Sequence, residues 1–251
     1  MALSFIPFAF PGVPGVRCAF QTRDLGHSEG VYGSGNIAYT VGDAPLRVSS
    51  NRMELAGTLE IPQLAELQQV HGDTLVFNPK PAPLERLVEA PALPEGDGMA
   101  TDRPGLGLLI KTADCQPVLL AHREGRHIAA FHIGWRGNRM NFLQSGIAAF
   151  CARYNLAARD LFAVRGPSLG PQRAQFVNYD REWGTDFADW FDAHDKTMNL
   201  WRLTRDQLRG AGLPEEHIFG LDLCTASMPD HFFSYRRDGI CGRQAGVVWM
   251  V

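Results

Sequence analysis

"TADCQPVLLAHREGRHIAAFHIGWRG" (residues 112–137) contains two apolar runs separated by a short charged turn. The runs cover residues 117–122 and 127–133, and the turn between them contains a glycine. Two short apolar runs joined by such a turn are typical of a β-hairpin. Cys115 stands just before the first run and His132 lies at the end of the second, so the predicted hairpin carries two metal-competent side chains at its ends.

Further apolar patterns on both sides of this hairpin predict the other elements of the fold. Runs rich in Val, Ile, Leu and Phe predict strands at residues 16–20, 74–78, 107–112, 161–165, 217–223 and 245–250. Apolar residues at three- and four-residue steps predict helices over residues 139–154, in the 180s, and from Pro45 to Gly57 with Asp43 as its cap.

The order of these elements favours one fold class. Strands come in clusters between isolated helices, without the regular alternation of a doubly wound sheet or a barrel, so we expect an α+β protein. No repeat or low-complexity tract divides the chain, and we predict one domain over residues 1–251. The proline-rich stretch 79–94 is expected to be a surface excursion.

The composition limits the class of function. The chain of 251 residues is 45% hydrophobic and 20% charged, which is typical of a soluble globular protein. Its net charge of −3 gives no basic field for nucleic acid or an anionic membrane, so neither is expected as a partner. No apolar run approaches the ~18 residues of a membrane span.

Cysteine usage and the N-terminal sequence indicate a cellular compartment. The five cysteines, at positions 18, 115, 151, 224 and 241, form no CxxC motif and no regular framework. Such a pattern is typical of free thiols in a reducing compartment. The first residues, "MALSFIPFAFPGVPG", lack a basic segment and contain three prolines, which is unlike a signal peptide. We therefore expect a cytoplasmic protein; its oligomeric state is left open.

Three side chains are candidate metal ligands. Catalytic zinc commonly takes three protein ligands from His, Cys and carboxylates and leaves a fourth position for water. Cys115 and His132 bracket the hairpin, and His71 lies in "QVHG", a turn at the end of another apolar segment. The alternatives are a buried free thiol and structurally hydrogen-bonded histidines. The polar residues around Cys115 and the "GWRG" after His132 favour a functional site over a plain core position.

Arginines near glycine-rich turns are candidate anion ligands. Arg136 lies in "GWRG" (134–137), just before the predicted helix, where exposed N–H groups favour an anion; the alternative is a glycine-rich turn with a solvated arginine. Arg236 and Arg237 could bind phosphate or a carboxylate, and the alternative is a structural salt bridge to Asp238. The segment 165–171, "RGPSLGP", is either a loop that faces a substrate or a tight turn.

Taken together, these motifs resemble one family over nearly the whole chain. The segments that carry the resemblance occur in the family's order and spacing: "GNIAYTVGD…NR" (35–52), "QQVHGD" (68–73), "DGMATDRPGLGLLIKTADCQPVLL" (97–120), "FHIGWRG" (131–137), "RGPSLGP" (165–171) and "CTASMPDHFFSYRRDGICGR" (224–243). The chain is similar to the YfiH family, labelled laccase-domain or polyphenol-oxidase-like and also purine nucleoside phosphorylase. It departs from the family pattern at Ile133, where alanine is usual, and after Pro171, where "QRAQF" replaces a cysteine-tyrosine segment.

The resemblance implies a fold, a metal site and an activity. The implied fold is a mixed β-sheet sandwich flanked by helices, similar to the catalytic domain of a bacterial deamidating toxin. The implied cofactor is one Zn²⁺, bound by His71, Cys115 and His132, with Cu²⁺ as a possible substitute in vitro. The implied activity is phosphorolysis of adenosine, inosine, guanosine and methylthioadenosine, together with adenosine deamination.

Candidate substrate contacts follow from this activity. Arginine is the natural partner of phosphate. The candidates for its binding are Arg52, Arg136, Arg236 and Arg237, and Asn36 is a candidate contact of the nucleoside. The expected partners are therefore small purine nucleosides and phosphate.

Three other functions are consistent with the same residues. A donor set of two histidines and one cysteine also suits copper, but a multicopper oxidase needs many more imidazoles, and the chain has eight histidines without an H-x-H pair. A cysteine-type or zinc hydrolase that edits peptidoglycan precursors would use Cys115 as nucleophile or zinc ligand. A binding protein with a structural zinc would need a fourth ligand, for which Cys224 is the candidate.

Overall fold

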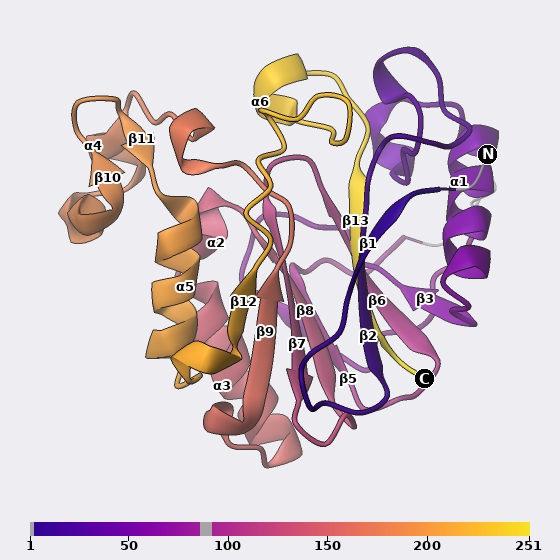
Figure 1. Cartoon of the computed structure of the whole chain (residues 1–251), viewed down its shortest axis with the longest axis horizontal. Coiled ribbons are helices and arrows are strands. Elements are labelled where there is room, and N and C mark those ends of the chain that lie inside the picture. The colour runs from indigo at the N-terminus through magenta and orange to yellow at the C-terminus, as the bar shows by residue number, and fades with distance from the viewer. Residues whose placement is uncertain (1–2, 86–91) are drawn as a thin grey trace.

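The predicted hairpin lies at the centre of the computed structural model, which describes residues 3–85 and 92–251 (Figure 1). Strands β7 (Gln116–His122) and β8 (Ile128–Ile133) pair antiparallel, and every residue of both strands is buried. Leu119 packs between two sheets, whereas Val118 packs against helices on the opposite face. The sequence of the hairpin consists of two continuous apolar runs because the second sheet covers one of its faces and helices cover the other.

Within the described residues, the strands form two large sheets and one small ribbon. The six-stranded sheet has the order β12 (Ile218–Gly220), β9 (Leu161–Arg165), β7, β8, β5 (Gly98–Thr101) and β4 (Leu75–Phe77). The five-stranded sheet has the order β1 (Phe5–Phe8), β2 (Val16–Gln21), β13 (Gln244–Met250), β6 (Leu106–Thr112) and β3 (Gln63–Ala65). A ribbon of β10 (Phe191–Asp192) and β11 (Thr197–Met198) lies apart from both.

The helices flank the two large sheets (Figure 1). Helix α1 (Pro45–Thr58) packs Leu55 on the outer face of the five-stranded sheet. Helices α3 (Phe142–Tyr154) and α5 (Leu200–Gly210) cover the outer face of the six-stranded sheet. Three short helices complete the set: α2 (Trp135–Arg139), α4 (Tyr179–Glu182) and α6 (Tyr235–Asp238). The predicted α+β class, with a mixed β-sandwich flanked by helices, is confirmed.

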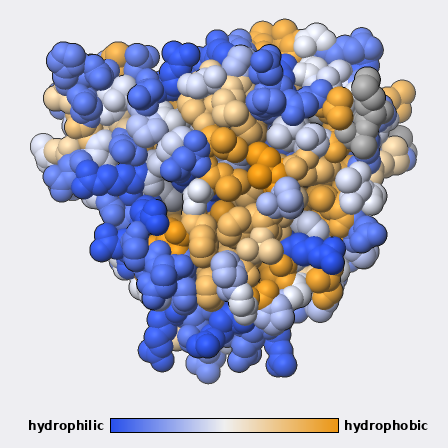
Figure 2. Space-filling model, viewed as in Figure 1, coloured by the Kyte–Doolittle hydropathy of each residue, from blue (hydrophilic) through white to orange (hydrophobic). Residues whose placement is uncertain are grey.

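Apolar side chains also close the sandwich at one side. The rings of Phe8 on β1 and Phe219 on β12 approach with centroids 5.5 Å apart, so they join the edge strands of the two sheets. Figure 2 shows apolar side chains gathered in the middle of this face and hydrophilic ones over the helices at its left. The contact continues the core between the sheets out to the molecular surface.

The predicted strands are all present, but the helices differ in three ways. The helix expected over 139–154 begins only at Phe142, because Asn141 has φ 55°, and "GWRG" itself forms the start of α2. The pattern in the 180s is broken at Gly184, which has φ 83°, and gives only α4 and a 3₁₀ turn. Asp43 does not cap α1 with its side chain.

Some elements were absent from the prediction. The short strands β1, β3, β5, β10 and β11 span four residues or fewer, which is too short for a periodic signal. The apolar residues of α5 are separated by charged ones, and its helical pattern was not identified. The proposed surface excursion at 79–94 includes residues 86–91, which lie outside the described residues.

The close approach of α3 to the hairpin yields a stability prediction. A Cβ on Gly146 of α3 would lie 2.5 Å from Cε1 of Phe131 on β8, so Gly146→Ala forces the helix from the sheet. We expect a loss of ~1–3 kcal/mol in the free energy of unfolding, measured by urea denaturation. Gly57 in α1 has nothing within 4 Å of such a Cβ, and Gly57→Ala is the control, expected to be neutral or stabilising. Equal stability of the two variants would contradict this packing.

Candidate metal centre

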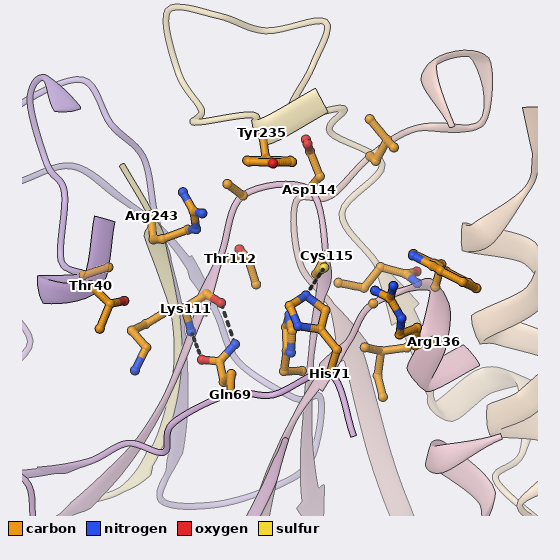
Figure 3. Close-up of a pocket in the computed structure, with 18 of the residues that line it drawn as sticks. Thr40, Gln69, His71, Lys111, Thr112, Asp114, Cys115, Arg136, Tyr235 and Arg243 are labelled. Atoms are coloured by element: carbon orange, nitrogen blue, oxygen red, sulfur yellow. Dashed lines mark hydrogen bonds between the residues drawn. The ribbon is translucent and has the colours of Figure 1, made fainter. Parts of the chain in front are cut away.

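His71, Cys115 and His132 meet at one end of the two sheets. Their ligand atoms all lie within 4.8 Å of one another, and Cys115 Sγ is 3.9 Å from His71 Nε2. Cys115 lies in the connection between β6 and β7, and His132 lies on β8 directly opposite Pro117. His71 is exposed, Cys115 is half-buried and His132 is buried, so the cluster opens on one side (Figure 3). The structure brings together all three residues that the sequence indicated.

One buried carboxylate, that of Asp97, holds two of these residues in place. Its Oδ1 lies 2.7 Å from Nδ1 of His132 and accepts from the backbone N–H of His71 at 3.0 Å. Its Oδ2 accepts from the N–H groups of Val70 at 3.1 Å and Gly72 at 2.7 Å. These bonds fix the turn in which His71 adopts φ 60°, and they leave Nε2 of His132 as the nitrogen available to a ligand.

The electrostatics of the cluster favour a thiolate. Burial alone would raise the pKa of Cys115, but the His132 and His71 imidazoles outweigh it and lower that pKa to about 6. Burial would lower the pKa of His132, whereas the Cys115 thiolate and the Asp97 carboxylate raise it to about 9. The pKa of Asp97 is lowered, because the hydrogen bonds from His132 and the turn outweigh its burial. Both shifts favour the charged forms of the pair, a Cys115 thiolate beside a His132 imidazolium.

Gly134 provides the space in which the cluster forms. A Cβ at this position would lie 3.0 Å from Cys115 Sγ and 3.1 Å from Cδ2 of His71. Glycine at the beginning of α2 therefore lets the backbone approach both side chains. This gives the "GWRG" motif a steric role beside the cluster, which the sequence alone did not reveal.

The cluster lies in a cavity of about 600 Å³. Its cationic side chains come from separate elements: Arg136 on α2, Arg236 on α6, Lys111 on β6 and Arg243 just before β13. Apolar side chains also line the cavity, among them Leu169, Phe176, Leu200 and Trp135, and so do the carboxylates of Glu66 and Asp114. A cavity with cations, an apolar wall and a His/Cys/His cluster suits a small polar molecule with an apolar ring.

The predicted arginines separate into two groups. Arg136 and Arg236 line the cavity, and their guanidinium groups lie over the rings of Trp135 at 4.5 Å and Phe176 at 5.7 Å. Arg237 does not line the cavity, because it pairs with Asp238 at 2.7 Å and donates to the carbonyl of Thr225. The alternative role for Arg237, a structural salt bridge, is the one present.

Asn36 and Arg52, both predicted to contact substrate, are completely buried and lie outside the cavity wall. Asn36 donates to Asp43 at 2.9 Å and accepts from the backbone N–H of Arg243 at 2.9 Å. Arg52 pairs with Glu66 at 2.6 Å and donates to the carbonyl of Ile37. Because both side chains are completely buried, neither can contact a substrate in the cavity directly, and instead they support the residues behind the cavity wall.

Asp114 fixes the C-terminal loop over the cavity. It adopts φ 91°, and its carboxylate accepts from Thr225 Oγ1 at 2.7 Å and from the backbone N–H of Arg236 at 2.6 Å. The loop "RGPSLGP" joins the same arrangement, because the N–H of Leu169 donates to the carbonyl of Asp114 at 2.9 Å. Leu169 lines the cavity, so this loop faces the site.

The donor set fits a single metal ion. Two imidazoles and a thiolate are ligands of both zinc and copper, and an open side is typical of a catalytic rather than a structural zinc. Among the described residues no fourth His, Cys, Asp or Glu joins this group, and Cys224 instead accepts from the N–H of Gly170. A second group, Asp192, His194 and Asp195, is fully exposed.

The fold and the cavity define a class: an α+β protein in which a His/Cys/His cluster that could hold a metal ion lies in a cavity. The chain belongs to the YfiH family, whose model, described as "Multi-copper polyphenol oxidoreductase laccase", matches residues 17–251. That description implies a metal site, although it does not identify the metal.

Known relatives cover almost the whole chain. A protein of Xylella fastidiosa named "Purine nucleoside phosphorylase" is 36% identical over 94% of this chain and 88% of its own length. "Purine nucleoside phosphorylase YfiH" of Escherichia coli is 32% identical over 96% of this chain and 97% of its own length. These names indicate that the chain is an enzyme.

Solved structures share the fold. Neisseria meningitidis protein NMB0706 matches with a TM-score of 0.83 and 30% identity, covering 98% of each chain. YlmD from Geobacillus stearothermophilus matches with a TM-score of 0.85 and 26% identity, covering 96% of this chain and 93% of that one. None of the helices among the described residues has the length and apolar character to cross a membrane.

The contacts of Asp97 predict a loss of metal affinity in the Asp97→Asn variant. An amide nitrogen cannot accept from the N–H groups of the turn, and the charge beside His132 is lost. We expect metal affinity to fall by about 10- to 100-fold, as for other partners of metal-binding histidines. Competition with a chromophoric chelator measures the change. Asp102→Asn is the control, because Asp102 is exposed and lies directly after β5, the strand that Asp97 precedes. Equal metal affinities in both variants would contradict the role of Asp97.

The lowered pKa of Cys115 predicts its reactivity in metal-stripped protein. Alkylation by iodoacetamide requires the thiolate, so its rate should rise with a midpoint near pH 6. Burial raises the pKa of Cys18 and Cys151, so these thiols react little in this range. Mass spectrometry of the labelled peptides across pH 4–10 measures the midpoint, with His132→Ala expected to raise it. A midpoint of ~8.5, the value of an ordinary cysteine, would show that the imidazoles do not stabilise the thiolate.

Proposed function

We propose that the chain is a zinc-dependent purine nucleoside phosphorylase that also deaminates adenosine. The observation that carries the proposal is that one cavity contains the His71–Cys115–His132 cluster, four cationic side chains and an aromatic wall. The names of the relatives support the same assignment. The proposed substrates are adenosine, inosine, guanosine and methylthioadenosine, with phosphate as the second substrate.

The metal would be held by His71, Cys115 and His132. When bound, zinc supplies Lewis-acid chemistry, which polarises a substrate group or lowers the pKa of water. Asp97 orients the His132 ring and the His71 turn, and Gly134 leaves room beside the sulfur. The three side chains converge with little reorganisation on binding, because the turn and the hairpin are already fixed.

Phosphorolysis requires charge stabilisation at both ends of the nucleoside. A phosphate oxygen forms a bond to C1′ of the ribose, the bond from C1′ to the purine nitrogen breaks, and the purine leaves with the electron pair and takes up a proton. Cationic side chains bind the phosphate and direct one oxygen at C1′. The apolar wall that includes Trp135 and Phe176 binds the purine ring and excludes water.

Adenosine deamination would use the same cavity. It replaces the amino group at C6 of the purine by an oxygen from water and releases ammonia. The purine on the apolar wall presents its ring to the neighbouring cluster, since Trp135 directly follows Gly134, which packs against Cys115. One binding mode therefore serves both proposed activities.

A second function is favoured by one specific arrangement. Cys115, His132 and Asp97 form a chain of interactions. The Asp97 carboxylate contacts Nδ1 of His132, and the His132 ring lowers the pKa of the Cys115 thiol. This is the order of a cysteine–histidine–aspartate triad, so a metal-free cysteine hydrolase acting on a peptidoglycan precursor is the alternative. A copper-dependent polyphenol oxidase has less support. Among the described residues, only one cluster of candidate metal ligands contains more than one histidine, whereas a multicopper enzyme needs many imidazoles.

Inosine cleavage in the presence and absence of phosphate tests the proposed function. We expect the zinc-loaded protein to release hypoxanthine only with phosphate and to form ribose 1-phosphate in equal amount. The Cys115→Ala variant should lose its zinc and at least about 100-fold in kcat/KM. Loss of a direct metal ligand should lower metal affinity and activity at least as much as loss of a group that orients a ligand. Chromatography of the products and metal analysis of the same samples measure both effects.

The control and the contrary outcomes separate the alternatives. Cys151→Ala removes a half-buried thiol on α3, outside the cavity lining, and should leave cleavage and zinc content unchanged. Cleavage that proceeds equally without phosphate would indicate a hydrolase. Full activity after removal of all metal, with loss in Cys115→Ala, would indicate that Cys115 is a nucleophile.

A further inference from the structure

Two cations line the cavity from neighbouring strands of the five-stranded sheet. Ala245 of β13 pairs with Lys111 of β6, and side chains alternate along a strand, so Arg243 lies on the same face as Lys111. Such diagonal neighbours have Cβ atoms about 7 Å apart, a gap that one phosphate can bridge with two of its oxygens. Figure 3 shows both on the side of the cavity opposite Arg136.

Arg243 is held in place, and none of the described carboxylates pairs with it. It is half-buried, and its Nη1 donates to the carbonyls of Cys241 at 2.8 Å and Gly242 at 2.9 Å. Its backbone N–H donates to buried Asn36. Within the described chain it forms no ion pair with a carboxylate, and its remaining donors are available to a ligand. A half-buried, fixed guanidinium without a carboxylate is suited to an oxyanion.

Lys111 is also positioned by its neighbours. Its Nζ donates to Glu66 and to the carbonyl of Leu67 at 3.0 Å, and the Gln69 side chain binds both backbone groups of Lys111. Glu66 is shared with buried Arg52. Arg52 and Lys111 therefore share the one carboxylate of Glu66, and together with Arg243 these side chains carry a net positive charge.

The opposite wall has a different chemistry. Leu169, Phe176 and Leu200 line it, together with Trp135, whose ring lies under the Arg136 guanidinium. An apolar, aromatic surface suits the purine better than a strongly hydrated dianion. Arg236 also lies on this wall, over the ring of Phe176, so the two walls differ in their apolar character rather than in the presence of cations.

We propose that Arg243 and Lys111 form the subsite for the phosphate co-substrate, with Asn36 and Arg52 as the buried groups that position them. The assignment depends on the proposed function only for the identity of the anion as co-substrate. In this assignment Arg243 and Lys111 bind phosphate and direct it at C1′ of a nucleoside whose purine lies on the apolar wall.

Phosphate binding to single-charge variants tests this subsite. Isothermal titration of inorganic phosphate into the zinc-loaded protein without nucleoside should show Kd raised at least about tenfold in Arg243→Gln and in Lys111→Gln, the size of a lost hydrogen bond to a charged group. The KM for phosphate in inosine cleavage should rise in parallel, with little change in the KM for inosine. Arg243→Lys, which keeps the charge, should lie between Arg243→Gln and the unaltered protein.

Two controls make the result decisive. Arg17→Gln removes an exposed charge at the far end of the same sheet, opposite Trp249, and should leave phosphate binding unchanged. Circular dichroism and the melting temperature show that each variant is folded. The proposal is overturned if Arg136→Gln weakens phosphate binding and Arg243→Gln does not.

The outcomes also distinguish the subsite from the proposed function. Phosphate bound through Arg243 and Lys111 in a protein that never cleaves inosine would retain the subsite and reject the phosphorylase. Phosphate-dependent cleavage with an unchanged phosphate KM in Arg243→Gln would retain the phosphorylase and reject the subsite.

Discussion

The Asp97 carboxylate is the interaction on which the site depends. It accepts three backbone N–H groups of the turn that carries His71 and contacts the ring of His132, so it joins two segments far apart in the sequence. A buried carboxylate is stable only when its oxygens are satisfied by such donors. Because both histidines depend on the same charge, their geometry is fixed before any ligand binds, and Cys115 completes a cluster already in place.

The two-sheet architecture determines what surrounds this cluster. The hairpin of β7 and β8 is buried on both faces, and its Cys115 and His132 end opens into a cavity lined by both sheets and the C-terminal loop. The side of the five-stranded sheet contributes Lys111 and Arg243, whereas the segments near α2 and α5 contribute apolar side chains together with Arg136. Figure 3 shows Lys111 and Arg243 on the side of the cavity opposite Arg136.

Much of this could be predicted from the sequence, for identifiable reasons. Central strands with two buried faces give long apolar runs. Histidine and cysteine are common metal ligands, and the polar residues beside Cys115 and His132 favour a functional site over a core position. Burial is harder to infer: Asn36 and Arg52 are of types that bind substrates, yet both are completely buried. Asp97 was missed because its partners lie 26 and 35 residues away. Arg243 was missed because its position depends on the register between β13 and β6.

The most direct test of the central claim is a crystal structure of the zinc-loaded protein with anomalous data collected on both sides of the zinc absorption edge. The account predicts one strong anomalous peak at the point where His71 Nε2, Cys115 Sγ and His132 Nε2 converge, with Asp97 still at Nδ1 of His132. A peak elsewhere, or a metal bound by four protein side chains, would contradict it. In either of those cases the cluster would not be an open catalytic metal centre.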